Sequence, residues 1–250
     1  MKLIGKMITI TGMAAALGAC SGNVPATDNA AENKEFRYLI DEFADLKIMR
    51  YQVPGWDELT LQQKEYVYHL SEAAKYGRDI IWAQNYKHNL SVRKALETIL
   101  EKYDGDRRCE DFKKFESYAK RVFFSNGIHH HYAEDKFFPE CPQEYFQSLM
   151  KAVGADDTEL LDIIYNPAVA PARKVMDSNA DIVAESAVNF YDGVTRAEVE
   201  KLYASMVDPN DKTPVSYGLN SKVVKGEDGV VREEVYKVNG LYGAALEKIC

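Results

Sequence analysis

Apolar side chains recur at three- and four-residue spacing in several parts of the chain, which is the pattern of helices that bury one face. Thr60 and Gln63 have the spacing of a capping box, so we expect the longest helix to run from Leu61 to about Gln84. The apolar series inside this helix predicts one buried face, made of Val67, Leu70, Ala74, Gly77 and Ile81.

Further helices are indicated by the same spacing together with local start and stop signals. Ser91 is expected to cap a second helix. A third helix should run from about Asp111 to Phe124 and stop at Asn126-Gly127, because these two residue types accept the backbone angles that end a helix. The remaining predicted helices lie at residues 142–152, 157–165 and about 196–207, the last opened by a capping box of Thr195 and Glu198.

Valine-rich stretches late in the chain predict a β-hairpin. They cover residues 221–225 and 230–238, and the turn-forming residues 226–229 (Gly-Glu-Asp-Gly) separate them. Residues 240–250 then resemble the first turns of a helix without a capping Gly or Pro, so we expect this chain to be a portion of a longer protein. The predicted fold class is α+β, mostly helical, with a small late sheet.

The first residues have the features of a secretory signal peptide. Lys2 and Lys6 precede an apolar, small-residue stretch over residues 7–19. Residues 17–20 (Leu-Gly-Ala-Cys) resemble the lipobox of bacterial lipoproteins, which implies lipidation of Cys20 and a lipid-anchored protein in the cell envelope, on the periplasm-facing outer membrane. The alternative is an ordinary signal peptide with an incidental cysteine. The polar residues 20–34 are expected to form a flexible tether, followed by a folded part over 35–250.

Composition places the folded part among globular proteins and argues against nucleic acid as a partner. The chain has 250 residues, of which 46% are hydrophobic, and a formal net charge of −8, with no concentrated basic face for phosphate binding. After Cys20, three cysteines remain: Cys109, Cys141 and Cys250. Buried free thiols and a bridge between Cys109 and Cys141 both remain open, and the spacing of the three is not that of a zinc site.

Residues 125–139 hold three of the five histidines and are the strongest candidate for chemistry. Adjacent side chains on one backbone point in different directions, so His129, His130 and His131 are poorly arranged to bind one metal ion. Three interpretations stay open: a metal site, a solvent-exposed polar loop, and a loop that faces a substrate.

Two segments together resemble dipeptidyl peptidase III, a zinc metallopeptidase family, and specifically its Bacteroides-type bacterial members. They are residues 66–77 (Tyr-Val-Tyr-His-Leu-Ser-Glu-Ala-Ala-Lys-Tyr-Gly) and the stretch from 125 to 139 that contains the histidines. A weaker similarity covers residues 217–222 and the hairpin after them. The likeness spans about residues 36–250.

The resemblance implies that this chain is the N-terminal portion of the lower lobe of a two-lobed enzyme that removes dipeptides from the N-terminus of short peptides. It also implies zinc in the full-length protein, bound by a His-Glu-x-x-Gly-His helix and a Glu-Glu helix. No histidine of this chain is followed by glutamate, so no catalytic residue and no metal ligand is assigned to it. The segment after Asn126 resembles residues that face the substrate. We therefore expect Tyr132 to form a wall for a substrate side chain, with Asn126 and His131 as polar contacts.

On this hypothesis the full-length protein is an enzyme, whereas the 250-residue chain alone is inactive and lacks the zinc site. The alternatives are a non-catalytic, membrane-anchored binding or scaffold lipoprotein, and a lipoprotein that captures metal through its histidines.

Overall fold

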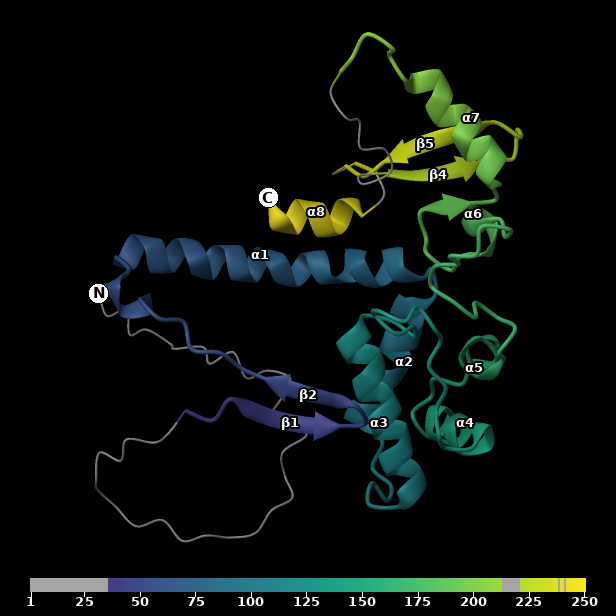
Figure 1. The fold of residues 1–250 in the computed structure, drawn as a ribbon. Helices are drawn as coiled ribbons and strands as arrows, with labels where there is room; N and C mark the ends of the chain where they lie inside the picture. The colour runs from purple at the N-terminus through teal and green to yellow at the C-terminus, as the bar shows by residue number, and fades with distance from the viewer. Residues whose placement is uncertain (1–35, 213–220, 238, 241) are drawn as a thin grey trace, which may run out of the picture. The chain divides into compact units, whose positions relative to one another are not determined.

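The computed structural model describes residues 36–212, 221–237, 239–240 and 242–250 (Figure 1). The chain divides into two units, residues 1–38 and 39–250, and the architecture below is that of the second. Of the described residues, 48% are helical and 12% lie in strands or bridges, which confirms a mixed α+β fold that is mostly helical. The predicted signal peptide, the predicted lipidation site at Cys20 and the predicted tether lie outside the described residues.

The long helix α1 spans Leu61–Asn85 and begins as predicted. Its capping box is complete: the Gln63 amide N–H donates to Thr60 Oγ1 at 3.3 Å, and the Thr60 N–H donates to Gln63 Oε1 at 2.9 Å. These two bonds satisfy amide groups that have no partner inside the helix.

The predicted buried face of α1 is wrong. Val67, Leu70 and Ile81 are exposed, and the only buried residues of the helix are Trp82 and Ala83 in its last turn. The 3.6-residue period shows which side chains share a face, but it does not show that a neighbouring element covers that face. In the described part of the chain the main cover is the short helix α8 (Gly243–Ile249), which lies alongside α1 in Figure 1.

The main core is built by the last turn of α1 and by four helices: α2 (Asn89–Lys102), α3 (Glu110–Ser125), α4 (Gln143–Ala152) and α5 (Thr158–Tyr165). Leu96, Phe115 and Phe146 are fully buried at its centre. Cys109 and Cys141 are free thiols, and neither forms a disulfide. Cys141 is buried, and burial raises the pKa of its thiol.

The start of α2 differs from the prediction. Asn89 is the first helical residue and His88 occupies the capping position, so Ser91 lies inside the first turn and is exposed. Asn89 is completely buried: its Nδ2 donates to the Trp82 carbonyl at 3.1 Å, and its Oδ1 accepts from the Ile128 amide at 3.2 Å. One side chain therefore ties the end of α1 to the loop that follows α3.

The late sheet has the order β3-β4-β5. Its Val223 packs with Val194 and Val199 in a second, smaller core. The predicted hairpin is confirmed, with β4 (Ser221–Lys225) antiparallel to β5 (Val231–Val235), while the short β3 (Tyr191–Asp192) pairs parallel to β4. Two helices complete this part: α6 (Ile182–Glu185) and α7 (Arg196–Met206), whose capping box is present.

A second hairpin, β1 (Leu39–Phe43) with β2 (Leu46–Met49), was not predicted. Its turn contains Ala44 at a φ of 48°. Asn or Gly usually occupies such a position, so nothing in the sequence indicated this turn. Contacts with α3 hold it: Lys120 pairs with Asp41 at 3.1 Å, and Arg121 pairs with Asp45 at 2.8 Å. A two-stranded sheet is only marginally stable alone, so these nonlocal pairs are what position it.

None of the helices within the described residues combines the length and the apolar character that a membrane crossing requires.

We predict that Asn89→Ala lowers the free energy of unfolding by about 2 kcal/mol, because two buried backbone groups lose a hydrogen-bond partner. Ser91→Ala is the matched control and should change stability by less than about 0.5 kcal/mol. Urea unfolding of both variants measures the difference. A loss of about 1 kcal/mol for Ser91→Ala would restore Ser91 as the cap of α2.

Candidate functional site

The candidate loop begins where α3 ends. Asn126 adopts the left-handed conformation (φ 54°), and the Gly127 N–H donates to the Val122 carbonyl at 3.0 Å, so the helix stops where the sequence predicted. Gly127 has a φ of 149°, and a Cβ at this position would lie 2.2 Å from Asn89 Nδ2. Only glycine therefore fits between the loop and the buried asparagine.

The side chain of His129 is buried beneath the loop and contacts the backbone of Ala170. Its Nε2 lies 2.8 Å from the Ala170 carbonyl oxygen, which can only accept, so Nε2 carries the proton in the neutral ring. The pKa of His129 is lowered to about 4, first because burial disfavours the charged ring and also because Lys136 and Arg173 are nearby. The ring is therefore neutral at pH 7.

Lys136 pairs with His129 in a β-bridge and is also buried. Its Nζ donates to the carbonyls of Asn166 at 2.7 Å and Val169 at 2.8 Å, just beyond the C-terminus of α5. Burial lowers the pKa of Lys136 to about 8. The ammonium group thus fixes the loop against carbonyls that α5 and its following turn leave without helical partners.

His130 organises the tip of the loop. Its Nδ1 accepts hydrogen bonds from the backbone N–H groups of Tyr132 at 3.1 Å and Ala133 at 3.0 Å. The Glu134 N–H also donates to the His130 carbonyl at 3.1 Å. These bonds hold the backbone that carries Tyr132 in one tight turn.

Arg173 braces this turn from a distant part of the chain. Its guanidinium binds the Glu134 carboxylate with two hydrogen bonds, from Nε at 2.7 Å and from Nη2 at 2.8 Å. It also donates to Asn85 Oδ1 at 3.1 Å and to the His131 carbonyl at 3.3 Å. The pKa of Glu134 is lowered, mainly by the hydrogen bonds from Arg173. A bidentate pair of this kind fixes direction as well as distance.

Four aromatic rings meet at the surface of the loop and form what we call the aromatic platform: Phe124, His130, His131 and Tyr132. The His130 and His131 rings are stacked with centroids 4.7 Å apart, and the Tyr132 centroid lies 4.4 Å from that of His131. Phe124 meets His131 edge-on at 5.1 Å. Tyr132 is 83% exposed and Phe124 is 40% exposed. The platform thus presents a large aromatic surface to solvent.

The turn of the β1–β2 hairpin lies near the platform. Arg121 binds Asp45 at 2.8 Å, and its guanidinium also lies over the Phe137 ring, 4.9 Å from the centroid. The pKa of Asp45 is lowered by its own backbone N–H, by Arg121 and, more weakly, by His130. A carboxylate and a guanidinium therefore border the aromatic surface.

The structure brings His131 and Tyr132 together on the platform, whereas Asn126 forms the turn at its base, where the Asn126 carbonyl accepts from Asn85 Nδ2 at 3.0 Å. The three histidines do not converge, because His129 faces the interior while the other two stack. No group of three or more potential metal ligands is found within the described residues. Sequence reasoning missed Arg173, which carries no local signal and lies 39 residues after Glu134.

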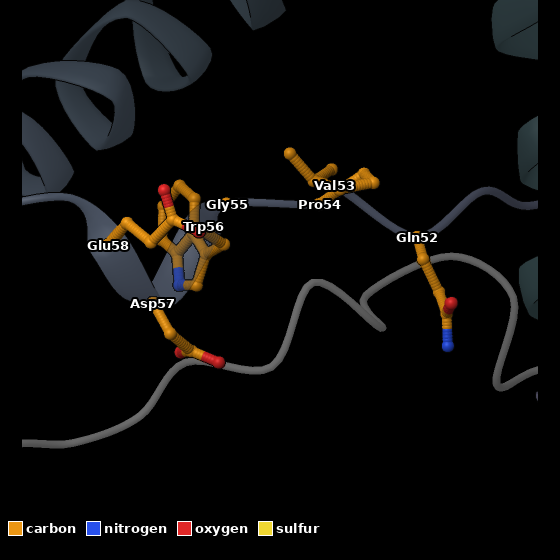
Figure 2. Close-up of a pocket in the computed structure, with 7 residues that line it drawn as sticks. All are labelled: Gln52, Val53, Pro54, Gly55, Trp56, Asp57 and Glu58. Atoms are coloured by element: carbon orange, nitrogen blue, oxygen red, sulfur yellow. The ribbon is translucent and has the colours of Figure 1, made fainter.

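Two hollows among the described residues lie away from the platform. One, of about 590 Å³, is lined by a single continuous segment, Gln52–Glu58, and Figure 2 shows Gln52 set apart from the turn that carries Trp56 and Glu58. Another, of 860 Å³, lies beside the β4–β5 turn and is lined largely by charged side chains. Neither includes a residue of the aromatic platform.

No protein-family model matches the chain, and no curated protein is similar to it at a significant level. The resemblance to dipeptidyl peptidase III therefore remains a prediction that rests on the residues themselves.

We predict that His129 makes the protein less stable in acid. The unfolded chain binds a proton on this ring as the pH falls through about 6.5, whereas the folded protein does not until about 4, so stability is lost across that window by up to about 3 kcal/mol. In His129→Gln, the free energy of unfolding should fall less between pH 7 and pH 4 than in the wild type. His69→Gln, on the exposed part of α1, is the control, and equal pH slopes for the wild type and His129→Gln would contradict the assignment.

Proposed function

We propose that the aromatic platform binds short peptides, and that this chain is the substrate-binding N-terminal portion, within the lower lobe, of a zinc-dependent dipeptidyl peptidase. The proposal rests on two properties of Tyr132. Its ring is 83% exposed, and its backbone N–H is held by a hydrogen bond to His130 Nδ1. An exposed aromatic ring on a restrained backbone is well suited to pack against a ligand side chain, since the backbone loses little conformational freedom on binding.

The platform also offers directed polar contacts. Because His130 Nδ1 accepts two backbone N–H groups, the neutral ring carries its proton on Nε2, which can donate to a peptide carbonyl. The brace between Arg173 and Glu134 holds the same turn, on which the His130 and Tyr132 ring centroids lie 6.5 Å apart. Together they support recognition of a peptide that presents both an apolar side chain and a backbone carbonyl.

The zinc ion of the proposed peptidase would be bound by a part of the full-length protein outside this chain. The described residues provide no set of three ligands, so they do not fit the ion, and we assign no chemical step to them. When bound to ligands outside this chain, zinc would polarise the scissile carbonyl and activate water. The part proposed for this chain is to bind and orient the peptide.

The place of action proposed is the cell envelope, with the protein anchored to the membrane through lipid on Cys20. Short peptides are the proposed partners, and nucleic acid is not, given the net charge of −8. A second candidate function is a non-catalytic binding lipoprotein, which is favoured by the exposed Tyr132 ring on a restrained turn, since such a surface could bind a peptide without a metal.

We predict that Tyr132→Ala weakens binding of a short synthetic peptide with apolar side chains by about tenfold, because a large apolar contact is removed. Tyr132→Phe should retain most of the affinity, since the ring remains. Tyr51→Ala is a matched control, because Tyr51 is also highly exposed (76%) and lies outside the platform. Titration calorimetry measures the affinity, and thermal melting should show all three variants folded. Equal affinity for Tyr132→Ala and the wild type would refute the role of the ring.

Metal content separates the two candidate functions. In protein isolated from its own cells with an antibody to residues 36–250, the peptidase hypothesis predicts bound zinc and release of dipeptides that stops when a chelator removes the metal. Peptide binding that persists without zinc and without dipeptide release would instead support the binding lipoprotein. An intact mass determined on the same material shows whether this sequence is part of a longer chain.

A further inference from the structure

Residues 166–171 form a surface segment, which we call the strap, and two buried basic residues of the candidate loop hold it in place. The strap carbonyls accept hydrogen bonds from the side chain of His129 and from the side chain and backbone N–H of Lys136. The accepting carbonyls are those of Asn166, Val169, Ala170 and Pro171. No residue of the strap is itself buried, although Val169 and Ala170 pack partly against the main core. A segment with few buried apolar contacts is the kind that opens locally.

The hydrogen bond from His129 falls on a strained residue of the strap. Ala170 has a φ of 47°, in the left-handed region that residues with a Cβ seldom adopt, because the Cβ then crowds a carbonyl oxygen. The carbonyl of this same residue lies 2.8 Å from His129 Nε2. One buried ring therefore helps to hold a backbone conformation that relaxes when the ring lets go.

The second ring nitrogen of His129 makes this contact sensitive to acid. Since Nε2 carries the proton of the neutral ring, Nδ1 is a bare acceptor, and it is buried without a hydrogen-bond partner among the described residues. A proton added to Nδ1 would become a buried donor with no acceptor, which is costly away from water. Release of the strap would expose Nδ1 to water, which accepts that hydrogen bond.

Burial and nearby charges together keep the ring neutral while the strap is closed. Burial is the main reason that the pKa of His129 is lowered to about 4, and Lys136 and Arg173 lower it further. The hydrogen bond to Ala170 and the charge of Glu134 oppose this shift. However, the Glu134 carboxylate is already bound by Nε and Nη2 of Arg173.

Two further titratable groups lie against this pair of basic residues. Asp162 on α5 faces Lys136 and favours its ammonium form, and Lys136, with a pKa lowered by burial to about 8, stays charged below pH 7. Tyr86 meets the His129 ring edge-on with centroids 5.8 Å apart, and burial raises the pKa of its hydroxyl, so it stays neutral in acid. Between pH 7 and pH 5, the member of the pair that changes its charge is therefore His129.

We propose that protonation of His129 releases the strap from the candidate loop, so that mild acid opens this part of the fold while the helical core stays intact. Arg173 follows the strap by two residues and braces the turn that carries the aromatic platform, so this turn loses part of its support when the strap detaches. The inference does not depend on the proposed peptide binding, because the release is measured without a peptide.

Hydrogen–deuterium exchange of the purified protein, followed by NMR at pH 7 and pH 5, tests the proposal. The Lys136 N–H reports on the strap, since it donates to the Pro171 carbonyl at 3.2 Å. The open ring of His129 binds a proton near pH 6.5 and the closed ring near pH 4, so the opening equilibrium should rise about 20-fold between pH 7 and pH 5. Amides of α3 around the buried Phe115 should change far less, after both are corrected for the exchange rate of an unstructured peptide.

A matched pair of variants separates the charge of the ring from its hydrogen bond. In His129→Gln the side-chain amide can still donate to the Ala170 carbonyl but does not titrate, so the acid effect on the Lys136 amide should disappear. In His69→Gln, on the exposed part of α1, the acid effect should persist in full. If His129→Gln does not fold, the comparison of the Lys136 and α3 amides in the wild type still decides.

Three outcomes would overturn the proposal. They are equal protection of the Lys136 amide at pH 7 and pH 5, an equal loss of protection at Lys136 and in α3, and an acid effect that survives in His129→Gln. The second outcome would mean that acid unfolds the whole protein and does not open the strap alone. A platform that fails to bind peptide would refute the proposed function and leave the release of the strap unaffected.

Discussion

The buried amide of Asn89 is the constraint on which the placement of the candidate loop depends. It joins the Trp82 carbonyl at the end of α1 to the Ile128 amide after α3, and it occupies the space that any side chain at position 127 would need. Because the side chain is removed from water, both its donor and its acceptor need a partner, and this arrangement of the three segments supplies both. The aromatic platform is built outward from that junction.

The loop then combines local and distant restraints. His130 binds its own turn, whereas Arg173 and Lys136 connect that turn to parts of the chain some 30 to 40 residues away. A surface that is exposed to water and still held from several sides can present a ring without support from a ligand. The proposed recognition role of the platform, which lies in neither of the described hollows, rests on this combination of exposure and restraint.

The features that sequence predicted well are those with local causes. The capping boxes at Thr60 and Thr195 and the left-handed turn at Asn126 follow from residues within one helical turn. The features it missed are set by distant contacts: the β1–β2 hairpin held by Lys120 and Arg121, and the Arg173 brace. Burial of the α1 face was predicted wrongly for the same reason, since periodicity reports a shared face and not the element that covers it.

Helix α1 is buried only at Trp82 and Ala83, although it continues for six turns before them. The backbone hydrogen bonds at its two ends are therefore broken by different opening events. Near Trp82 an amide proton exchanges with solvent only when the core opens, whereas near Leu61 it exchanges when the end of the helix frays. One continuous helix thus carries a gradient of local stability, from a segment as durable as the core to a segment that unwinds and re-forms independently of it.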